Sequence, residues 1–461
     1  MDSDHDTIAA IATAPGEAGI AVVRISGPES LGIADRVFRS SGPRPSERPG
    51  GSFAHGFIRR HPDAGETGRD VDEVILLVYR APHSYTREDV VEIQCHGGRA
   101  SARRILTIVL SAGARAAEPG EFTKRAFLNG RIDLLQAEAV ADLIRAQSDR
   151  AASAAIEQLE GGLSCSFRTL YDCLLSAACD LEATLDFVEG ELPEETLRET
   201  SARLASAKAL AKELLATREE GHVLRDGALV VICGRPNVGK STLLNTLLGK
   251  SRAIVTEVPG TTRDSIEETV IIDGYPLRLV DTAGLRSTDC RIEQEGVARA
   301  QTLMEKADIL IYMIDGSQPL DPGERAVVQS LGPGRTVVVV NKEDLGLRVR
   351  EQDLAPHEPA VCSMTRQTGL DELRRAVVSR LGVGSSLETG AAISGRHYHI
   401  IQNALNNMND AEALLATRND EFIVLAANTI RAALRELGKV TGQEYTEELL
   451  NSIFSRFCVG K

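Results

Sequence analysis

The sequence predicts a multidomain protein with an N-terminal α+β domain, an all-α helical domain, and an α/β P-loop domain inserted into the helical one. Short β-type runs alternate with helical runs before residue 119. Ala- and Leu-rich helical patterns cover residues 121–220 and return after residue 395. Between them, a strand-like run leads into a phosphate-binding motif. At 461 residues the chain is longer than one hydrophobic core usually supports.

Changes in composition set the predicted boundaries. Residues 1–119 form the α+β domain, 120–222 the first helical part, 223–382 the P-loop domain, and 383–461 the second helical part. Pro119-Gly120 opens the first helical run, and a Gly/Ser-rich stretch at 382–390 reads as a linker. Insertion of one domain into another is compatible with domain anatomy.

Hydrophobic periodicity predicts the individual elements. In the first domain, strands are expected at 7–12, 19–26, 53–58, 74–79 and 90–94, and helices at 31–38 and 100–110. In the helical parts, Asp133 and Gln136 form a capping pair, Gly161-Gly162 interrupts a helix over 148–188, and another helix runs from Pro193 to near Gly221. The last three helices are expected at 395–417, 420–437 and 445–457.

Composition excludes several classes of protein. No apolar run approaches 18 residues, which predicts no membrane span, and the acidic start is unlike a targeting peptide. The eight cysteines are scattered, so neither a zinc site nor a disulfide framework is indicated, and a cytoplasmic location is expected. The net charge of −14 gives no overall attraction to nucleic acid, so contact with RNA would require local patches.

The stretch Gly234–Ser241 matches the pattern GxxxxGK[ST]. It follows a buried-strand pattern at Ala228–Cys233 and precedes a helical pattern at Thr242–Leu248, which is the context a P-loop requires. Backbone N–H groups of such a loop hold phosphate oxygens, Lys240 reaches the β- and γ-phosphates, and Ser241 offers a hydroxyl to Mg²⁺. A chance match is disfavoured because the flanks fit and further nucleotide motifs follow in order.

Two of these motifs complete a phosphate site. The strand pattern at 276–280 runs into Asp281-Thr282-Ala283-Gly284, where the carboxylate can hold Mg²⁺ through water and Gly284 can bring a backbone N–H to the γ-phosphate. In the polar loop Gly260–Asp264, Thr262 can add a second hydroxyl to Mg²⁺. The alternative for this loop is a Thr/Asp helix-capping turn.

The motif Asn341-Lys342-Glu343-Asp344 after a buried strand at 336–340 selects the base. The Asp344 carboxylate can accept hydrogen bonds from N1–H and the amino group of guanine, a donor pair that adenine lacks. The order of the motifs therefore predicts GTP. Ser363-Met-Thr365 occupies the place of a last guanine-contacting loop.

Hydrolysis needs a group that orients water, and Leu285 stands where Ras-like GTPases carry a glutamine. Glu293 and Glu295 are the acidic candidates, although a solvated helix face explains them equally well. No arginine finger is identifiable, so another cation must offset the charge of the transition state.

Together with the nucleotide motifs, six further stretches and the terminal Phe457–Lys461 carry a resemblance to the MnmE (TrmE) family of tRNA-modification GTPases over essentially the whole length. These stretches are Val23–Gly27, Glu88–Glu92, His96–Gly98, Pro119–Phe122, Arg125–Asn129 and Gln136–Ala139. The resemblance implies Glu293 as the catalytic residue that orients water. It also implies a K⁺ held by Asn237, Thr256, Val258 and Thr261. The implied nucleotide-binding set is Asn237, Val238, Gly239, Lys240, Ser241, Thr242, Thr256, Glu257, Val258, Pro259, Gly260, Thr261, Thr262, Asp281, Thr282, Ala283, Gly284, Asn341, Lys342, Glu343 and Asp344.

The same resemblance implies a homodimer built through folate-binding-like N-terminal domains. A formyl- or methylene-tetrahydrofolate site is expected to use Arg24, Glu92, Arg131 and Lys461. The cations would hold the glutamate carboxylate and Glu92 would accept the N–H donors of the pterin. Taken singly, each of these residues reads as a surface ion pair. Cys95 stands where the family often has Gly and is expected to narrow this pocket, and Cys458 is either a packing residue or a reactive thiol.

Members of the family are expected to act with the flavoprotein MnmG (GidA), in a heterotetramer or larger complex. They would add an aminomethyl or carboxymethylaminomethyl group to wobble uridines of certain tRNAs, with FAD and NADH on the partner. Two other hypotheses are a switch for ribosome assembly like Era or Der, and a dynamin-like mechanical role. The absence of a GxxG tail or a second G domain counts against the first, and the absence of a membrane-binding patch against the second.

Overall fold

The computed structural model describes residues 6–59, 70–185, 194–251, 267–281, 302–383, 392–417, 420–442 and 444–461. Within these ranges the chain separates into two compact units. The first, here called the N-terminal unit, comprises residues 1–141 together with 441–461. The second, the central unit, comprises residues 142–440. The multidomain fold with mixed sheets and a helical part agrees with the fold class predicted from the sequence.

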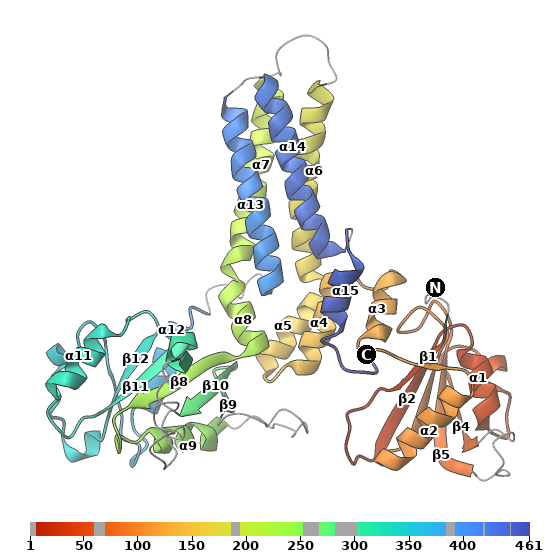
Figure 1. The fold of residues 1–461 in the computed structure, drawn as a ribbon, viewed down its shortest axis with the longest axis horizontal. Coiled ribbons are helices and arrows are strands. Elements are labelled where there is room, and N and C mark those ends of the chain that lie inside the picture. The colour runs from red at the N-terminus through yellow and green to blue at the C-terminus, as the bar shows by residue number, and fades with distance from the viewer. Residues whose placement is uncertain are drawn as a thin grey trace. The chain divides into compact units, whose positions relative to one another are not determined.

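The N-terminal unit is built on a seven-stranded sheet in the order β3-β4-β5-β6-β2-β1-β7 (Figure 1). Its strands are β1 (Ile8–Ile11), β2 (Ile20–Ser26), β3 (Phe38–Arg39), β4 (Ser52–Arg59), β5 (Asp70–Tyr79), β6 (Val90–His96) and β7 (Arg115–Ala116). All neighbours are antiparallel except β1 and β7. The strands and helices predicted for this region are thus confirmed within a few residues at each end.

The two faces of this sheet have different neighbours. Helices α1 (Ser30–Val37) and α2 (Arg99–Ser111) pack on the face that carries Val23, Ile25 and Ile93. On β1 the alternate residues Ile8 and Ala10 join a separate small core with Phe122 and Ala117. The second face of β2 and β6 is thereby available to carry polar side chains.

The N-terminal unit also contains α3 (Glu121–Leu128), α15 (Glu447–Phe454) and most of α4 (Leu134–Arg145), whose last turn belongs to the central unit. The capping pair at the start of α4 is confirmed: the backbone N of Gln136 donates to Oδ1 of Asp133 at 2.8 Å, and the backbone N of Asp133 donates to Oε1 of Gln136 at 3.0 Å. The end of the chain packs on β1, where a Cβ at Gly460 would lie 2.4 Å from the carbonyl oxygen of Ile11. Glycine is therefore required at position 460.

The helices of the central unit include α5 (Asp149–Leu159), α6 (Gly162–Leu185), α7 (Glu194–Ala216), α8 (Arg218–Asp226), α13 (Gly395–Ala416) and α14 (Asp420–Thr441). Figure 1 shows α6, α7, α13 and α14 running side by side as a bundle. Many of the buried positions are alanines, which permits close approach: Ala177, Ala207, Ala211, Ala404, Ala411, Ala426 and Ala433. The break predicted at Gly161-Gly162 is confirmed, because α5 ends at Leu159 and α6 begins at Gly162.

The prediction of one helix from Pro193 to Gly221 was wrong. The helix stops at Ala216, and α8 continues past Gly221 to Asp226. At the break, the hydroxyl of Thr217 donates to the carbonyl of Leu214 at 2.8 Å and accepts from the backbone N of Ile393 at 3.3 Å. A Cβ at Gly221 would lie 2.4 Å from the carbonyl oxygen of Ile393, so this glycine marks a close backbone approach and not a helix end.

The α/β part of the central unit has a six-stranded sheet in the order β13-β12-β11-β8-β10-β9. The strands are β8 (Ala228–Gly234), β9 (Glu267–Ile272), β10 (Tyr275–Asp281), β11 (Ile309–Asp315), β12 (Thr336–Asn341) and β13 (Ala360–Val361), and only β9 is antiparallel to its neighbour. Alternate residues of β8 enter two different cores: Val230 and Ile232 face α9 (Lys240–Ser251) and α12 (Leu370–Arg380), whereas Leu229 and Val231 face α11 (Pro322–Ser330).

An ionic contact of His222 links helix α8 to this sheet. His222 lies with Nδ1 3.1 Å from Oδ2 of Asp226 and with Nε2 3.8 Å from Oδ2 of Asp308, just before β11. The hydrogen bonds to Asp226 and Asp308 outweigh the effect of burial and raise the pKa of His222 to about 10. The imidazolium form is therefore the one that the folded protein stabilises.

Substitution His222→Gln is expected to lower the free energy of unfolding by about 1 kcal/mol at pH 6.5, since solvent screens a side chain that is 41% exposed. Because the folded pKa lies above the unfolded value, the contribution is complete below pH 6.5 and disappears as the pH rises through 10. Urea unfolding of both proteins across this pH range measures the difference. The same substitution at exposed His399 is the control, and a difference that does not change with pH would contradict the assignment.

Candidate functional site

The predicted P-loop lies between β8 and α9, as the sequence indicated. Asn237 has φ 64° and Gly239 has φ 107°, left-handed backbone angles that turn the loop sharply. Nζ of Lys240 donates to the carbonyl oxygens of Gly234 at 3.0 Å and Arg235 at 2.7 Å. The side chain of Lys240, 7% exposed, is thus folded over the concave side of the loop, where phosphates are held in such sites.

The Asn341 side chain ties the P-loop to the base-recognition segments. Its Nδ2 donates to the carbonyl oxygen of Val238 at 2.7 Å, and its Oδ1 accepts from the backbone N of Met364 at 3.1 Å. A Cβ at position 239 would lie 2.4 Å from this Nδ2, so only glycine fits there. One buried amide therefore fixes the spacing between three loops that are distant in the sequence.

The predicted guanine-reading residues are also held by specific contacts. Oγ of Ser363 donates to Oδ1 of Asp344 at 2.5 Å, which orients the carboxylate. Nζ of Lys342 lies 2.6 Å from Oδ2 of Asp315. Burial opposes ionisation of Asp315, but hydrogen bonds from Lys342 and Ser317 outweigh it and lower the pKa of this carboxyl. These contacts hold Asp344 and Lys342 of the predicted base-selecting segment in place.

Ser241 and Asp281 come together as predicted. Oγ of Ser241, at the start of α9, donates to Oδ2 of Asp281, at the end of β10, at 2.8 Å. Asp281 is 3% exposed, and its strand pairs in parallel register with β8 directly before the P-loop. Hydroxyl and carboxylate oxygens are ligands that Mg²⁺ prefers, so the donors present fit this ion.

Other predicted site residues lie outside the described ranges. These are Thr256–Thr262, Thr282–Gly284 and Glu293, together with Leu285 and Glu295. Of the predicted K⁺ ligands, only Asn237 is described, and its side chain is exposed at the P-loop. The remaining members of the nucleotide set, Thr242 and Glu343, lie exposed at the start of α9 and beside Asp344.

The four predicted folate residues gather in the N-terminal unit. Arg24 on β2 and Glu92 on β6 are directly opposite in the antiparallel register, and Nε and a terminal nitrogen of Arg24 both lie 2.8 Å from Oε1 of Glu92. A further Arg24 nitrogen donates to the carbonyl oxygen of Gly460 at 3.4 Å. Burial, followed by the charge of Arg24, lowers the pKa of Lys461.

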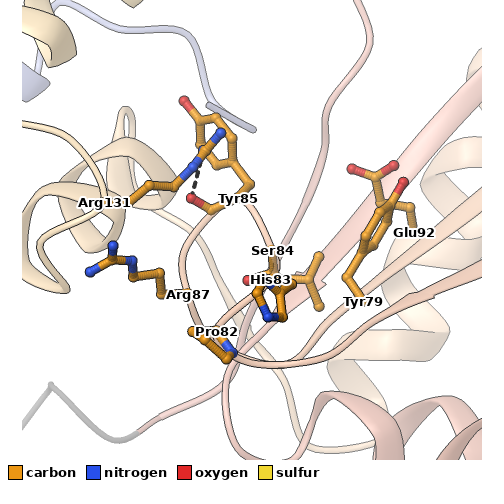
Figure 2. A pocket seen from close by; sticks show the side chains of 9 residues that line it. Tyr79, Pro82, His83, Ser84, Tyr85, Arg87, Glu92 and Arg131 are labelled. Carbon is orange, nitrogen blue, oxygen red and sulfur yellow. Dashed lines mark hydrogen bonds between the residues drawn. The ribbon is translucent and has the colours of Figure 1, made fainter. Parts of the chain in front are cut away.

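Two of these residues, Glu92 and Arg131, line a pocket of about 540 Å³, which is within the size range of small-molecule sites. Its lining residues are Tyr79, Pro82, His83, Ser84, Tyr85, Arg87, Val90, Glu92 and Arg131. Figure 2 shows Arg131 beside Tyr85 on one side of the pocket and Glu92 beside Tyr79 on the other. Burial and then the negative charge of Glu92 raise the pKa of Tyr79, so its hydroxyl stays protonated and available as a donor.

The expectation that Cys95 narrows this pocket was wrong. Cys95 is buried in the core on the opposite face of the sheet, with Val23 and Ile93. Side chains of a strand alternate between faces, and Cys95 lies three residues from Glu92, so the two must point in opposite directions. Cys458 is exposed in the segment after α15.

Tyr79, Tyr85 and Asp315 were not predicted as site residues. Of these three, Asp315 could have been found from the sequence. It ends an apolar strand pattern, and the other predicted nucleotide-binding residues also follow the carboxyl ends of strands in the same sheet.

No helix among the described residues is long and apolar enough to cross a bilayer.

Comparison with known sequences extends over both units. The profile of the TrmE N-terminus matches residues 7–131, and that of the MnmE helical domain matches residues 134–458. The tRNA modification GTPase MnmE of Geobacter sulfurreducens is 45% identical over 463 residues, covering 99% of this chain and 99% of that protein. Its counterparts in Geobacter metallireducens and Geobacillus kaustophilus are 44% and 43% identical over 462 and 468 residues, covering 99% and 100% of each chain. With similarity of this degree along its whole length, the chain belongs to the MnmE family of tRNA modification GTPases.

Proposed function

We propose that this GTPase drives the addition of an aminomethyl or carboxymethylaminomethyl group to C5 of the wobble uridine in certain tRNAs. One observation carries the proposal. The chain combines an ordered guanine-nucleotide site in the central unit with a separate cationic pocket in the N-terminal unit. The first is suited to GTP and the second to an anionic one-carbon carrier, and the reaction requires both.

In the nucleotide site, Lys240 would move from the loop carbonyls to the β- and γ-phosphate oxygens. Ser241 would hold Mg²⁺ directly, Asp281 would hold it through water, and Thr262 would add a second hydroxyl when the triphosphate is bound. The bound ion supplies positive charge to the transferring phosphoryl group. Asp344, oriented by Ser363, would accept the two N–H donors of guanine.

The charge that an arginine finger supplies elsewhere would come from K⁺. Asn237, Thr256, Val258 and Thr261 offer the oxygen ligands, and association of two G domains across their nucleotides would order this loop. Glu293 would orient the attacking water through a second water. The exposed, left-handed Asn237 at the P-loop supports its part in this proposal.

The N-terminal pocket would bind a formyl- or methylene-tetrahydrofolate. Arg131 and Lys461 would meet the glutamate carboxylates, and Glu92 would accept the N–H donors of the pterin. Because Arg24 is paired with Glu92 at 2.8 Å, we assign it to orienting that carboxylate. The protein would form a homodimer through this unit.

The partner would be the flavoprotein MnmG, in a heterotetramer or larger complex in the cytoplasm, with FAD and NADH supplied by the partner. The match to MnmE relatives over 99% of the chain favours this assignment over a ribosome-assembly switch or a dynamin-like protein.

Deletion of the gene for this protein is expected to remove the modified wobble uridines from cellular tRNA. Mass spectrometry of the nucleosides measures their loss. Complementation with the wild-type chain should restore them, whereas a Lys240→Ala variant should not. Unchanged nucleosides in the deletion strain would refute the proposed function.

Substitution Asp344→Asn is expected to reduce the preference for GTP over ATP by about 100-fold, because an amide cannot accept both guanine donors and the lost hydrogen bonds are charge-assisted. Competition binding with labelled GTP measures the ratio. The neighbouring exposed Glu343→Gln should keep the preference, and equal discrimination by both variants would contradict the role of Asp344.

Exchange of NaCl for KCl at equal ionic strength is expected to raise GTP turnover at least about tenfold, since a bound cation stabilises the charge developing on the phosphates. The variant Asn237→Ala should lose this response while still binding GTP. Equal turnover in the two salts would remove K⁺ from the proposal.

A further inference from the structure

The ring of Tyr85 is shared by two arginines from distant parts of the sequence. Cζ of Arg24 lies 5.1 Å from the ring centroid, and Cζ of Arg131 lies 4.8 Å from it. Both distances are within the range of cation–π attraction. Arg24 comes from β2, whereas Arg131 follows α3, so one aromatic side chain contacts two guanidinium groups from different elements.

Tyr85 is itself fixed at three points. Its hydroxyl forms a 2.8 Å hydrogen bond with Oγ1 of buried Thr123. Its ring packs against the small core that contains Ile8 and Phe122. Its carbonyl oxygen accepts from a terminal nitrogen of Arg131 at 2.8 Å, which Figure 2 shows as a dashed line. The hydrogen bond to Thr123 and the packing against the small core do not involve the arginines, so the position of the ring is set independently of the two guanidinium groups.

The ring of Tyr85 therefore affects the groups proposed to bind both ends of the folate, the pterin and the glutamate carboxylate. Arg24 places both its Nε and a terminal nitrogen on Oε1 of Glu92, so the ring that orients Arg24 also orients the Glu92 carboxylate. Arg131, which is proposed to bind the glutamate carboxylate of the folate, stacks on the same ring. The two positive charges repel each other, and the electron-rich face of the ring offsets part of this repulsion.

We propose that Tyr85 is the positioning residue of the pocket, holding Arg24–Glu92 and Arg131 at the separation that a reduced folate requires. The inference rests on the proposed folate function. Tyr85 acts through the arginines, so its contribution depends on their presence. The face of the ring makes the contacts with the arginines, and the hydroxyl only helps to hold the ring in place.

The test is the binding of 5-formyltetrahydrofolate to the full chain by titration calorimetry. Tyr85→Leu is expected to raise the Kd about tenfold or more, because Arg131 loses its ring contact and Arg24 keeps only its contact with the Phe122 ring at 5.6 Å. Tyr85→Phe should stay within about threefold of wild type, since the cation–π contacts remain. Phe57→Leu is the matched control: it removes a cation–π contact with Arg39 at 5.5 Å in the same unit, but it does not line the pocket, so binding should be unchanged.

A double-mutant cycle separates positioning from direct contact. Arg131→Ala should raise the Kd more than Tyr85→Leu does. The increase in Kd of the double variant should be much smaller than the product of the two single increases, because part of the Tyr85 effect passes through Arg131. Independent losses, or a Tyr85→Leu variant that binds like wild type, would overturn the inference.

Thermal unfolding of each variant shows whether it folds. If Tyr85→Leu does not unfold cooperatively, Tyr85→Met supplies a ringless side chain of larger volume, and the same result is expected. A wild-type chain that fails to bind the folate would instead refute the proposed pocket function, so the two failures are distinguishable.

Discussion

The nucleotide site depends on the side-chain amide of Asn341. Its two polar atoms bind the P-loop at Val238 and the loop at Met364, which is predicted to contact guanine, while its own backbone belongs to β12. A buried amide left with one unpaired atom costs about 1–3 kcal/mol, so both contacts must form together. Because Gly239 leaves space for this amide, the P-loop and the two loops predicted to recognise the base share one support. The position of Asp344 relative to Lys240 is therefore set by the fold.

In the N-terminal unit, strand register plays the same part. Arg24 and Glu92 are directly opposite each other on β2 and β6. The neighbouring pair, Val23 on β2 and Ile93 on β6, points to the opposite face of the sheet and belongs to the hydrophobic core. A register shift of one residue would bury the ion pair and expose the core. The packing of the hydrophobic face thus fixes the strand register, and with it the pairing of polar side chains on the other face. The hydrophobic packing and the position of the Arg24–Glu92 pair therefore cannot be varied independently on these two strands.

Much of this architecture could be predicted from sequence, because the nucleotide motifs are short and lie next to strongly apolar strands. The contacts that orient them could not, since Asp315 reaches Lys342 only through the β11–β12 register, and no local pattern around Tyr85 points to arginines at positions 24 and 131. The helix break at Thr217 was missed because no Gly or Pro marks it. The position of Cys95 could have been predicted correctly, since its odd spacing from Glu92 in a strand already implies that the two side chains point to opposite faces.

The strand β10 joins the nucleotide site to the helices of the central unit. At its end, Asp281 accepts from Ser241. At its start, the hydroxyl of Tyr275 donates to Oε1 of Glu220 on α8 at 2.9 Å, and Arg150 on α5 lies 2.9 Å from the same oxygen, with its guanidinium 4.3 Å from the Tyr275 ring. The strand between these contacts is buried and paired on both sides, so it cannot bend without breaking ladder hydrogen bonds. A displacement of Asp281 along the strand axis would therefore be carried to Tyr275, where it must either move α5 and α8 or break a buried hydrogen bond.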